Sequence, residues 1–313
     1  MRRIAAALSI CLLTSACFGQ HAASTPANTK AVLVTGASTG IGRKIAERLA
    51  ADGYFVYAGA RKESDLKALG AIKNVQAIQL DVTKTTAIAN AMELIAKGGR
   101  GLYGLVNNAG VATAGTLAET SAEEFDLVMT VNVYGPYRMT KAALPLLLAS
   151  KGRITTIGSI SGVLASQNLF AYSMSKHAVE AFTDSLAQQL ESSGIIVNIV
   201  EPGDYNSAIG KSAAERMGPR SSSVDATQYR LLADRSQFKE PDEVAEAVEH
   251  ALFDPTPKRR YMVTPNLAEA ELTIRKQIRQ LAQLNEGQPY TYDRDSLVKM
   301  LDEALVGSRA RLK

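Results

Sequence analysis

The stretch AVLVTGASTGIGRKIAERLA at residues 31–50 decides the fold of this chain. A short β-branched run leads into a glycine turn, and a helical pattern follows the turn. The glycines of the turn are Gly36, Gly40 and Gly42. Glycines let the backbone approach a phosphate closely, while the free N–H groups and the dipole at the start of the helix stabilise negative charge. Alone, the pattern is weak evidence, because glycine turns close many strand-to-helix junctions.

Further β-branched runs follow, and the spacing leaves room for a helix between each pair. They lie at residues 54–59, 75–80, 102–107, 153–158, 195–200 and 260–264. The runs are almost continuously apolar, which is typical of strands that are covered on both faces. Strands that alternate with helices predict right-handed crossovers. We therefore expect an α/β fold with a doubly wound parallel sheet of about seven strands and helices on both faces.

The composition excludes several classes of protein. With 313 residues, 46% of them hydrophobic and 21% charged, the chain can bury one large core. Its net charge of +4 is small and no dense block of Lys and Arg occurs, so we expect no nucleic-acid partner. The three histidines are scattered, and both cysteines, Cys11 and Cys17, lie near the N-terminus. This argues against a metal site, thiol redox chemistry and a Ser-His-Asp triad.

The chain divides into three expected segments. Residues 1–29 combine a signal-like leader with a linker, residues 30–265 form the main domain, and residues 266–313 form a C-terminal helical extension. Within the domain, residues 204–239 lose periodicity, which is typical of a substrate-binding loop or lid. The extension contains two amphipathic stretches, which we expect to pack on the domain or on a partner subunit. A capping box of Thr120 and Glu123 is expected to start one helix.

Several motifs follow the expected strands. In chain order they are Asn108-Ala109-Gly110, Asn132, Ser159, Tyr172-x-x-x-Lys176 and Pro202-Gly203. With these motifs the chain resembles the short-chain dehydrogenase/reductase family over residues 31–264. The spacing T-G-x-x-x-G-x-G at residues 35–42 is typical of its single-domain oxidoreductase branch. The resemblance implies a Rossmann fold, a nicotinamide cofactor and hydride transfer at an alcohol or carbonyl group.

The resemblance implies a catalytic set of Asn132, Ser159, Tyr172 and Lys176. Tyr172 would exchange a proton with the substrate oxygen, which Ser159 would position by a hydrogen bond. A free phenol has a pKa of about 10, so work near neutral pH demands a lowering of roughly three units, or about 4 kcal/mol. Lys176, one helical turn along, would supply the positive charge and hold the nicotinamide ribose. Asn132 would anchor a water that relays protons to Lys176; the alternative is a tolerated surface amide.

The resemblance also implies the nucleotide contacts. Ala60 and Arg61 stand where NAD-preferring relatives carry an Asp, and the arginine would suit a 2′-phosphate. We therefore expect NADP(H) in preference to NAD; an exposed arginine that only ends the strand is the alternative. The expected contacts are Gly36, Ser38, Thr39, Gly40, Ile41, Gly42, Arg61, Asp81, Val82, Asn108, Ala109, Gly110, Tyr172, Lys176, Pro202, Gly203, Tyr205 and Ser207.

Within the family, the segments GLYGLVNNAG at 101–110 and YSMSK at 172–176 look most like the retinol dehydrogenase and 17β-hydroxysteroid dehydrogenase group. This implies interconversion of a secondary alcohol with a ketone or aldehyde on a lipophilic substrate, such as a steroid, retinoid or long-chain compound. Two alternatives stay open: a non-catalytic NADP(H)-binding regulator or scaffold, and a membrane-tethered carrier for apolar ligands. The family usually pairs through the helices that contain Phe125 and Phe182, which implies a homodimer or homotetramer.

The N-terminus bears on location. Arg2 and Arg3 precede an apolar run at residues 4–13, and small residues lead into Cys17, as in a secretory signal peptide. Ala16-Cys17 resembles a lipoprotein cleavage site, although Thr14 departs from that pattern. We favour an active site that faces the cytoplasm, with membrane association through the N-terminus. The alternatives are export with a lipid anchor at Cys17 and a leader that never directs export.

Overall fold

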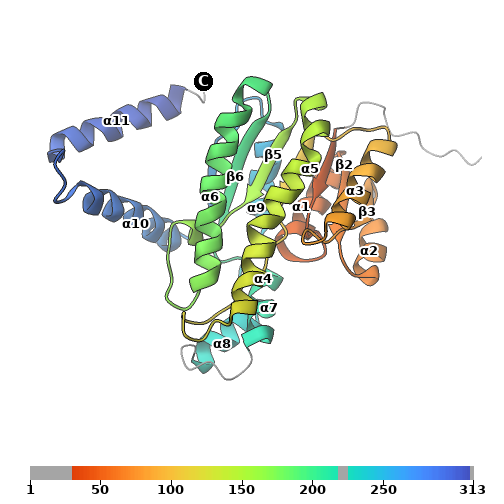
Figure 1. Cartoon of the computed structure of the whole chain (residues 1–313), viewed down its shortest axis with the longest axis horizontal. Helices are drawn as coiled ribbons and strands as arrows, with labels where there is room; N and C mark the ends of the chain where they lie inside the picture. Colours follow the sequence, from red (N-terminus) through yellow and green to blue (C-terminus); the bar gives the residue numbers. More distant parts are fainter. Residues whose placement is uncertain (1–29, 218–224, 311–313) are drawn as a thin grey trace, which may run out of the picture.

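A computed structural model describes residues 30–217 and 225–310 (Figure 1). The leader and its Cys17, on which the expectations about location rest, lie outside the described residues. The strands of the sheet are β1 Ala31–Val34, β2 Phe55–Ala60, β3 Val75–Gln79, β4 Gly104–Asn107, β5 Arg153–Ile157, β6 Ile196–Pro202 and β7 Arg260–Val263. All neighbouring pairs are parallel and the spatial order is β3-β2-β1-β4-β5-β6-β7. The predicted seven-stranded, doubly wound sheet is confirmed, with strand ends that shift by one or two residues.

Helices cover both faces of this sheet (Figure 1). They are α1 Gly40–Ala51, α2 Glu63–Gly70, α3 Thr85–Lys97, α4 Ala122–Asn132, α5 Tyr134–Ser150, α6 Phe170–Leu190, α7 Ala208–Met217, α8 Ala226–Ala233, α9 Asp242–Phe253, α10 Leu267–Asn285 and α11 Arg294–Ala310. Successive residues of a strand point to opposite faces, so β1 divides its side chains between two cores. Val32 and Val34 join the core under α1, α2 and α9, whereas Leu33 joins the core under α3, α5 and α6. The continuous apolar runs are explained by this two-sided burial.

The chain reverses its winding direction between β1 and β4, which are neighbours in the sheet. The crossover from β1 leads through α1 towards β2, while the crossover from β4 leads through α4 and α5 towards β5. The chain therefore leaves the carboxyl ends of β1 and β4 in opposite directions, and the crevice outside such a switch point is where doubly wound folds bind their ligands.

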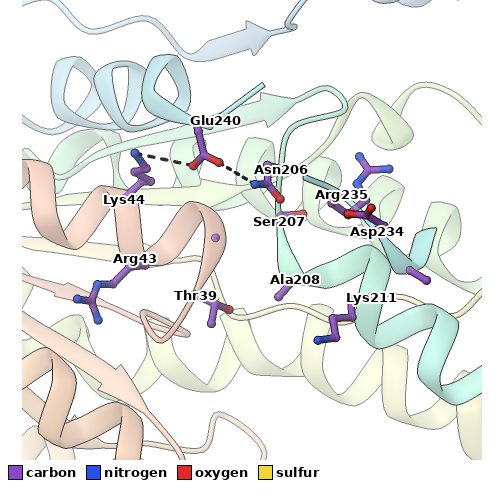
Figure 2. Close-up of a pocket in the computed structure, with 12 residues that line it drawn as sticks. Thr39, Arg43, Lys44, Asn206, Ser207, Ala208, Lys211, Asp234, Arg235 and Glu240 are labelled. Carbon is purple, nitrogen blue, oxygen red and sulfur yellow. Dashed lines mark hydrogen bonds and ion pairs between the residues drawn. The ribbon is translucent and has the colours of Figure 1, made fainter. Parts of the chain in front are cut away.

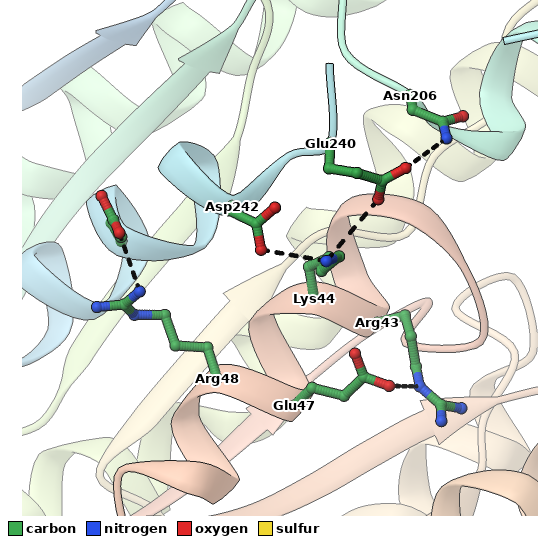
Figure 3. A network of polar contacts seen from close by, with 8 residues as sticks. Arg43, Lys44, Glu47, Arg48, Asn206, Glu240 and Asp242 are labelled. Atoms are coloured by element: carbon green, nitrogen blue, oxygen red, sulfur yellow. Dashed lines mark hydrogen bonds and ion pairs between the residues drawn. The ribbon is translucent and has the colours of Figure 1, made fainter. Parts of the chain in front are cut away.

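Ion pairs join α1 to α9 (Figure 3). Lys44 contacts Asp242 at 3.1 Å and Glu240 at 3.8 Å, and the Glu240 carboxylate accepts a 2.7 Å hydrogen bond from the Asn206 side-chain amide. Arg48 contacts Glu249 at 2.6 Å one turn further along α1. Exposed pairs of this kind add little stability one by one. Their position matters more, because they connect the helix after the glycine turn to the segment that follows β6.

The start of α4 corrects one expectation. The capping box is formed by Ser121 and Glu124, and not by Thr120 and Glu123. The Glu124 backbone N–H donates to Ser121 Oγ at 3.2 Å, and the Ser121 N–H donates to the Glu124 carboxylate at 3.2 Å. Thr120 belongs to the preceding turn, because its hydroxyl donates to the Thr116 carbonyl at 2.8 Å. Either pair fits the capping pattern in sequence, and only the preceding turn decides between them.

Residues 204–239 contain more regular structure than the loss of periodicity indicated. The helices α7 and α8 form on either side of residues 218–224, which lie outside the described part of the chain. Both helices are short, with 10 and 8 residues, and they contact one another. The segment therefore carries a helical pair next to the end of β6, on the same edge of the sheet as the crevice (Figure 1).

The C-terminal extension is helical as expected, but only the start of α10 lies against the domain. Helices α10 and α11 extend away from the sheet (Figure 1), and Ile274, Ile278 and Leu281 are 50%, 58% and 50% exposed. The first turn of α10 is held by Glu269, whose carboxylate accepts a 2.8 Å hydrogen bond from the Asp204 N–H, and by Thr273, which is buried. Successive residues of an α-helix are rotated by 100°, so Thr273 lies on a different side of α10 from Ile274, Ile278 and Leu281. The side of α10 that contacts the domain is therefore not its apolar side.

The described residues contain no helix that is both long enough and apolar enough to cross a membrane.

Candidate active site

The glycine turn after β1 is pressed against the turn after β4. A Cβ atom on Gly36, where φ is +65°, would lie 2.8 Å from the Ala109 Cα, and one on Gly42 would lie 2.3 Å from the Asn108 side-chain nitrogen. That nitrogen donates to the carbonyls of Thr35 at 2.8 Å and Gly36 at 3.0 Å. Both glycines are thus required by close approach, and Asn108 locks the two turns together at the crevice.

Thr35, the first residue of the T-G-x-x-x-G-x-G motif, completes this lock, a role that the sequence did not reveal. Its buried hydroxyl accepts hydrogen bonds from the backbone N–H groups of Asn108 at 2.9 Å and Ala109 at 3.0 Å, and donates to the Val106 carbonyl at 3.2 Å. A threonine that ends a strand is too common a feature to single out in sequence. Its role becomes visible only when β4 lies beside β1.

The start of α1 fits an anionic ligand. The helix begins at Gly40, and the side chain of the preceding Thr39 does not cap it. The first turn, Gly40 to Arg43, carries no acidic residue, so the positive end of the helix dipole is not neutralised within it. Ser38 and Ile41 are partly exposed and Thr39 is exposed beside this end. The closely approached backbone and the uncapped N–H groups match what a dinucleotide pyrophosphate requires.

A pocket of 460 Å³ opens between α1 and the segment after β6 (Figure 2). Thr39 and Gly40 line one side, and Ser207 and Ala208, where α7 begins, line the other. A Cβ on Gly40 would lie only 3.2 Å from the Ser207 Cα, so the two segments meet at the edge of the pocket. Basic side chains around it include Lys44, Lys211 and Arg235. Ser207 is thereby brought next to the glycine turn.

Tyr172, Lys176 and Ser159 come together at the carboxyl end of β5. Tyr172 and Lys176 lie one turn apart on α6, and the Lys176 Nζ is 5.5 Å from the centre of the Tyr172 ring. The ammonium donates a 2.9 Å hydrogen bond to the Ile157 carbonyl at the end of β5. Ser159, two residues further, shares a hydrogen bond with the Tyr172 phenol. The phenol, the hydroxyl and the ammonium therefore lie together at this end of β5.

Asn132 lies behind this group and is 3% exposed, so the alternative of a surface amide is wrong. It is the last residue of α4. Its side-chain oxygen accepts from the Val111 N–H at 2.9 Å, and its nitrogen donates to the Val111 carbonyl at 2.8 Å and to Ser175 Oγ at 2.9 Å. The amide therefore fastens α4 both to the turn after β4 and to α6. Every side-chain hydrogen bond that it makes is to the interior of the domain.

The pKa values around Tyr172 run against the sequence expectation. Burial raises the pKa of Tyr172 to about 12, while the hydrogen bond from Ser159 lowers it and the negative charge of Asp204 raises it further. Burial also lowers the pKa of Lys176 to about 8, which the negative charge of Glu180 partly offsets. For both residues, the free-energy cost of burying the charged form is larger than the stabilisation of that form by Ser159 or Glu180. The protein groups alone thus keep the phenol protonated, and do not supply the lowering that was expected of Lys176.

The end of β2 has no acidic side chain. Ala60 is buried and Arg61 is exposed directly after it. Asp81, at the end of the third strand, accepts hydrogen bonds from the Thr83 N–H at 2.9 Å and hydroxyl at 2.7 Å. Burial raises the pKa of Asp81, but these bonds and the positive charge of Arg61 lower it overall. Arg61, Asp81 and the buried Val82 therefore lie close together beyond the glycine turn.

The segment after β6 places one expected contact elsewhere. Pro202 ends β6, and the Gly203 N–H donates to the Val263 carbonyl at 2.8 Å. Tyr205 is 2% exposed, and its hydroxyl donates to the Glu243 carboxylate of α9 at 2.6 Å. Its side chain is thus part of the core under α1 and α9 and does not line the crevice. The physical reason is its size: a phenol on this short connection is stabilised most by burial with its hydroxyl paired.

Three more charged residues lie behind Lys176 and were not singled out in the sequence. Glu180 is one turn further along α6, Glu201 is on β6 and Arg260 is on β7. Both carboxylates contact the Arg260 guanidinium. Glu180 follows Lys176 at the spacing of one helical turn, which was a usable signal; the partners on β6 and β7 were not predictable without the sheet order.

The fold and this crevice define a nucleotide-binding α/β protein of the doubly wound class. The family model described as short chain dehydrogenase matches residues 30–218. The chain belongs to that family, and is an NAD(P)-dependent short-chain dehydrogenase/reductase.

Individual relatives are consistent with this assignment. The chain is 35% identical over 265 residues to the mitochondrial D-beta-hydroxybutyrate dehydrogenase of Bos taurus, a match that covers 75% of this chain and 77% of that protein. It is 38% identical to the 17-beta-hydroxysteroid dehydrogenase type 6 of Bos taurus, over 58% of each chain. The crystal structure of a short-chain dehydrogenase from Streptomyces avermitilis superposes with a TM-score of 0.70 at 30% identity, covering 82% of this chain and 96% of that one.

The glycine turn yields a first prediction. Replacing Gly42 with Ala places a methyl group where Asn108 and the Gly36 carbonyl already lie, at 2.3 and 2.4 Å. The turn must open, and we expect NADP(H) affinity to fall at least about tenfold, or 1.4 kcal/mol. Calorimetric titration with NADPH measures this directly. Gly70→Ala is the control, because no atom lies within 4 Å of the Cβ it would add; equal affinities for the two variants would contradict the assignment of the turn.

Proposed function

We propose that the protein is an NADP(H)-dependent oxidoreductase that interconverts a secondary alcohol with a ketone, or a primary alcohol with an aldehyde. The observation that carries this proposal is the grouping of Tyr172, Lys176 and Ser159 at the carboxyl end of β5, on the same edge of the parallel sheet as the glycine turn after β1. A bound nicotinamide would supply or accept the hydride. The pyrophosphate would be held by the start of α1 and by the turn from Gly36 to Gly42, whose backbone can approach it closely.

The side chains would divide the proton work. The Ser159 hydroxyl would donate a hydrogen bond to the substrate oxygen and hold it beside the Tyr172 phenol. Tyr172 would give that oxygen a proton in reduction and take it back in oxidation. Its raised pKa, to about 12, means that the phenol holds the proton that reduction needs. Lys176 would place a positive charge in the site and hold the ribose hydroxyls. Asn132 would fasten α4 to α6 and anchor a water that relays protons to Lys176.

A lipophilic substrate is supported by the likeness of the catalytic and cofactor segments to the hydroxysteroid and retinol dehydrogenase group. The similarity to a D-beta-hydroxybutyrate dehydrogenase supports a second candidate, a short hydroxy acid. The helices α7 and α8 would cover the substrate in either case, since they lie beside the end of β6. A non-catalytic nucleotide-binding regulator is the alternative outside catalysis, and the intact tyrosine, lysine and serine weigh against it.

The catalytic assignment is tested with NADPH and a panel of steroid, retinoid, long-chain and short 3-keto acid carbonyl compounds. We expect at least one to be reduced, and Tyr172→Phe to lower kcat by about 10²–10⁴-fold while NADPH binding stays unchanged. Tyr290→Phe is the control, because Tyr290 is 80% exposed on the extension. Unchanged turnover by Tyr172→Phe would refute the assignment, and nucleotide binding without any turnover would favour the regulator.

Cofactor preference would rest on Arg61. The exposed guanidinium follows the buried Ala60 and lies close to Asp81, and no carboxylate at the end of β2 would repel a 2′-phosphate. We expect wild-type protein to bind NADPH at least about tenfold more tightly than NADH, and Arg61→Asp to reverse the preference. Arg279→Asp on α10 makes the same charge change far from the crevice. Equal affinity of the wild type for the two cofactors, measured by calorimetry, would contradict the proposal.

We also propose that the protein forms a homo-oligomer, a dimer or tetramer, in which a second copy of the chain packs against the outer side of α6. The core side of α6 buries Val179, Thr183 and Ala187, while Phe182 and Leu186 are only half-buried on the next row. This second apolar row lies on the helix through which the family usually pairs. Light scattering at micromolar concentration is expected to give twice or four times the chain mass, and a monomer mass would count against the proposal.

A further inference from the structure

A buried carboxyl group lies directly behind the proposed catalytic lysine. Tyr172, Lys176 and Glu180 occupy successive turns of α6 and therefore one face of the helix. The Glu180 side chain is 13% exposed and that of Glu201 is 7% exposed. One guanidinium serves both, since Arg260 Nη1 contacts the Glu180 carboxylate and lies 2.9 Å from Glu201 Oε1.

The space for Glu180 is made by two glycines on the segment that carries Ser159. A Cβ on Gly158 would lie 2.9 Å from Glu180 Oε1, and a Cβ on Gly162 would lie 2.8 Å from the same atom. Ile157, whose carbonyl accepts the hydrogen bond from the Lys176 ammonium, immediately precedes Gly158. The carboxyl group therefore packs against the backbone that positions both Lys176 and Ser159.

Charge at this place is not balanced. Glu180, Glu201 and Asp184, whose Oδ2 is 2.5 Å from Arg260 Nη2, together face a single guanidinium. Glu180 Oε1 is buried and has no hydrogen-bond partner among the described residues. Burial, the negative charge of Glu201 and a hydrogen bond shared with the Glu201 side chain raise the pKa of Glu180 to about 7, although Arg260 acts in the opposite direction. A buried carboxylate oxygen without a hydrogen-bond partner costs free energy. Protonation of Glu180 near neutral pH removes this cost.

We propose that Glu180 is a positioning residue whose carboxylate raises the proton affinity of Lys176, and through Lys176 sets the readiness of Tyr172 to exchange its proton. This deepens the proposed function and rests on it. Ionised Glu180 stabilises the cationic form of Lys176, whose proton affinity burial has weakened. Neutral Glu180 withdraws that support.

The groups that face Glu180 from each neighbouring element are few. They are Lys176 and Asp184 on α6, Glu201 on β6 and Arg260 on β7. The segment from Gly158 to Gly162 presents no ionisable side chain. Asp184 contacts Arg260 but is 47% exposed and lies two turns from Lys176, so water screens its charge. This difference makes Asp184 the matched control: it shares the guanidinium but not the place behind the lysine.

The test measures the lysine directly, without substrate. Carbon-13 labelled lysine is titrated by NMR in the full chain, and the Lys176 signal is identified by its loss in Lys176→Met. We expect Glu180→Gln to lower the pKa of Lys176 by about one unit, a tenfold change in proton affinity. Asp184→Asn should leave it within a few tenths of a unit, and Glu180→Asp should restore most of the shift. An unchanged Lys176 titration in Glu180→Gln would overturn the proposal.

A second readout follows the carboxyl group itself. A carboxyl whose folded pKa is raised contributes its full stability below the unfolded pKa, near 4.5, and loses it as the pH rises through about 7. The free energy of unfolding of the wild type should therefore fall relative to that of Glu180→Gln between these pH values, and a constant difference would overturn the proposal.

If a substrate is found, the alkaline limb of kcat/KM should move to lower pH in Glu180→Gln alone. If no compound of the panel were reduced, the proposed function would be rejected. The titration of Lys176 would then still test the influence of Glu180 on Lys176.

Discussion

The close contact between the turn after β1 and the turn after β4 is the constraint on which the rest of the site depends. Two glycines allow the backbones to meet, and the Asn108 amide donates to the Thr35 and Gly36 carbonyls across the junction. A buried threonine hydroxyl closes the same junction from the strand side. Because the winding of the sheet reverses here, this contact sets the width of the crevice and aims the uncapped start of α1 into it.

The second half of the site is assembled around the end of β5. Here the Ile157 carbonyl, the Ser159 hydroxyl and the α6 side chains meet, and burial dominates their proton affinities. A phenol that is harder to ionise and an ammonium that is easier to neutralise both follow from the loss of water. The carboxylates behind Lys176 oppose part of this effect. The pKa values in this region therefore depend on a small network of charged side chains that spans α6, β6 and β7, and not on the tyrosine and lysine alone.

Much of this was predictable from residue order. The sheet with seven strands followed from apolar runs at regular intervals, and the main site residues followed from motifs that resemble a known family. Asn132 could not be judged between a buried and a surface amide, because its burial depends on how α4 meets α6 and Val111. Tyr205 could not be placed either, since its partner Glu243 is 38 residues away on α9. The extension formed its helices as expected, but its apolar side turned away from the domain.

The sequence by itself determined the succession of strands and helices along the chain, the glycine turn, and the placement of the tyrosine and lysine on one helical face. Each of these depends on neighbours within a few residues. The tertiary structure alone decided which charges surround those side chains. Glu180, Glu201 and Arg260 come from separate elements, and they meet only because α6 packs over β6 and β6 pairs with β7. Electrostatic energies change steeply with distance and exposure, so they are fixed only when distant segments have been brought together.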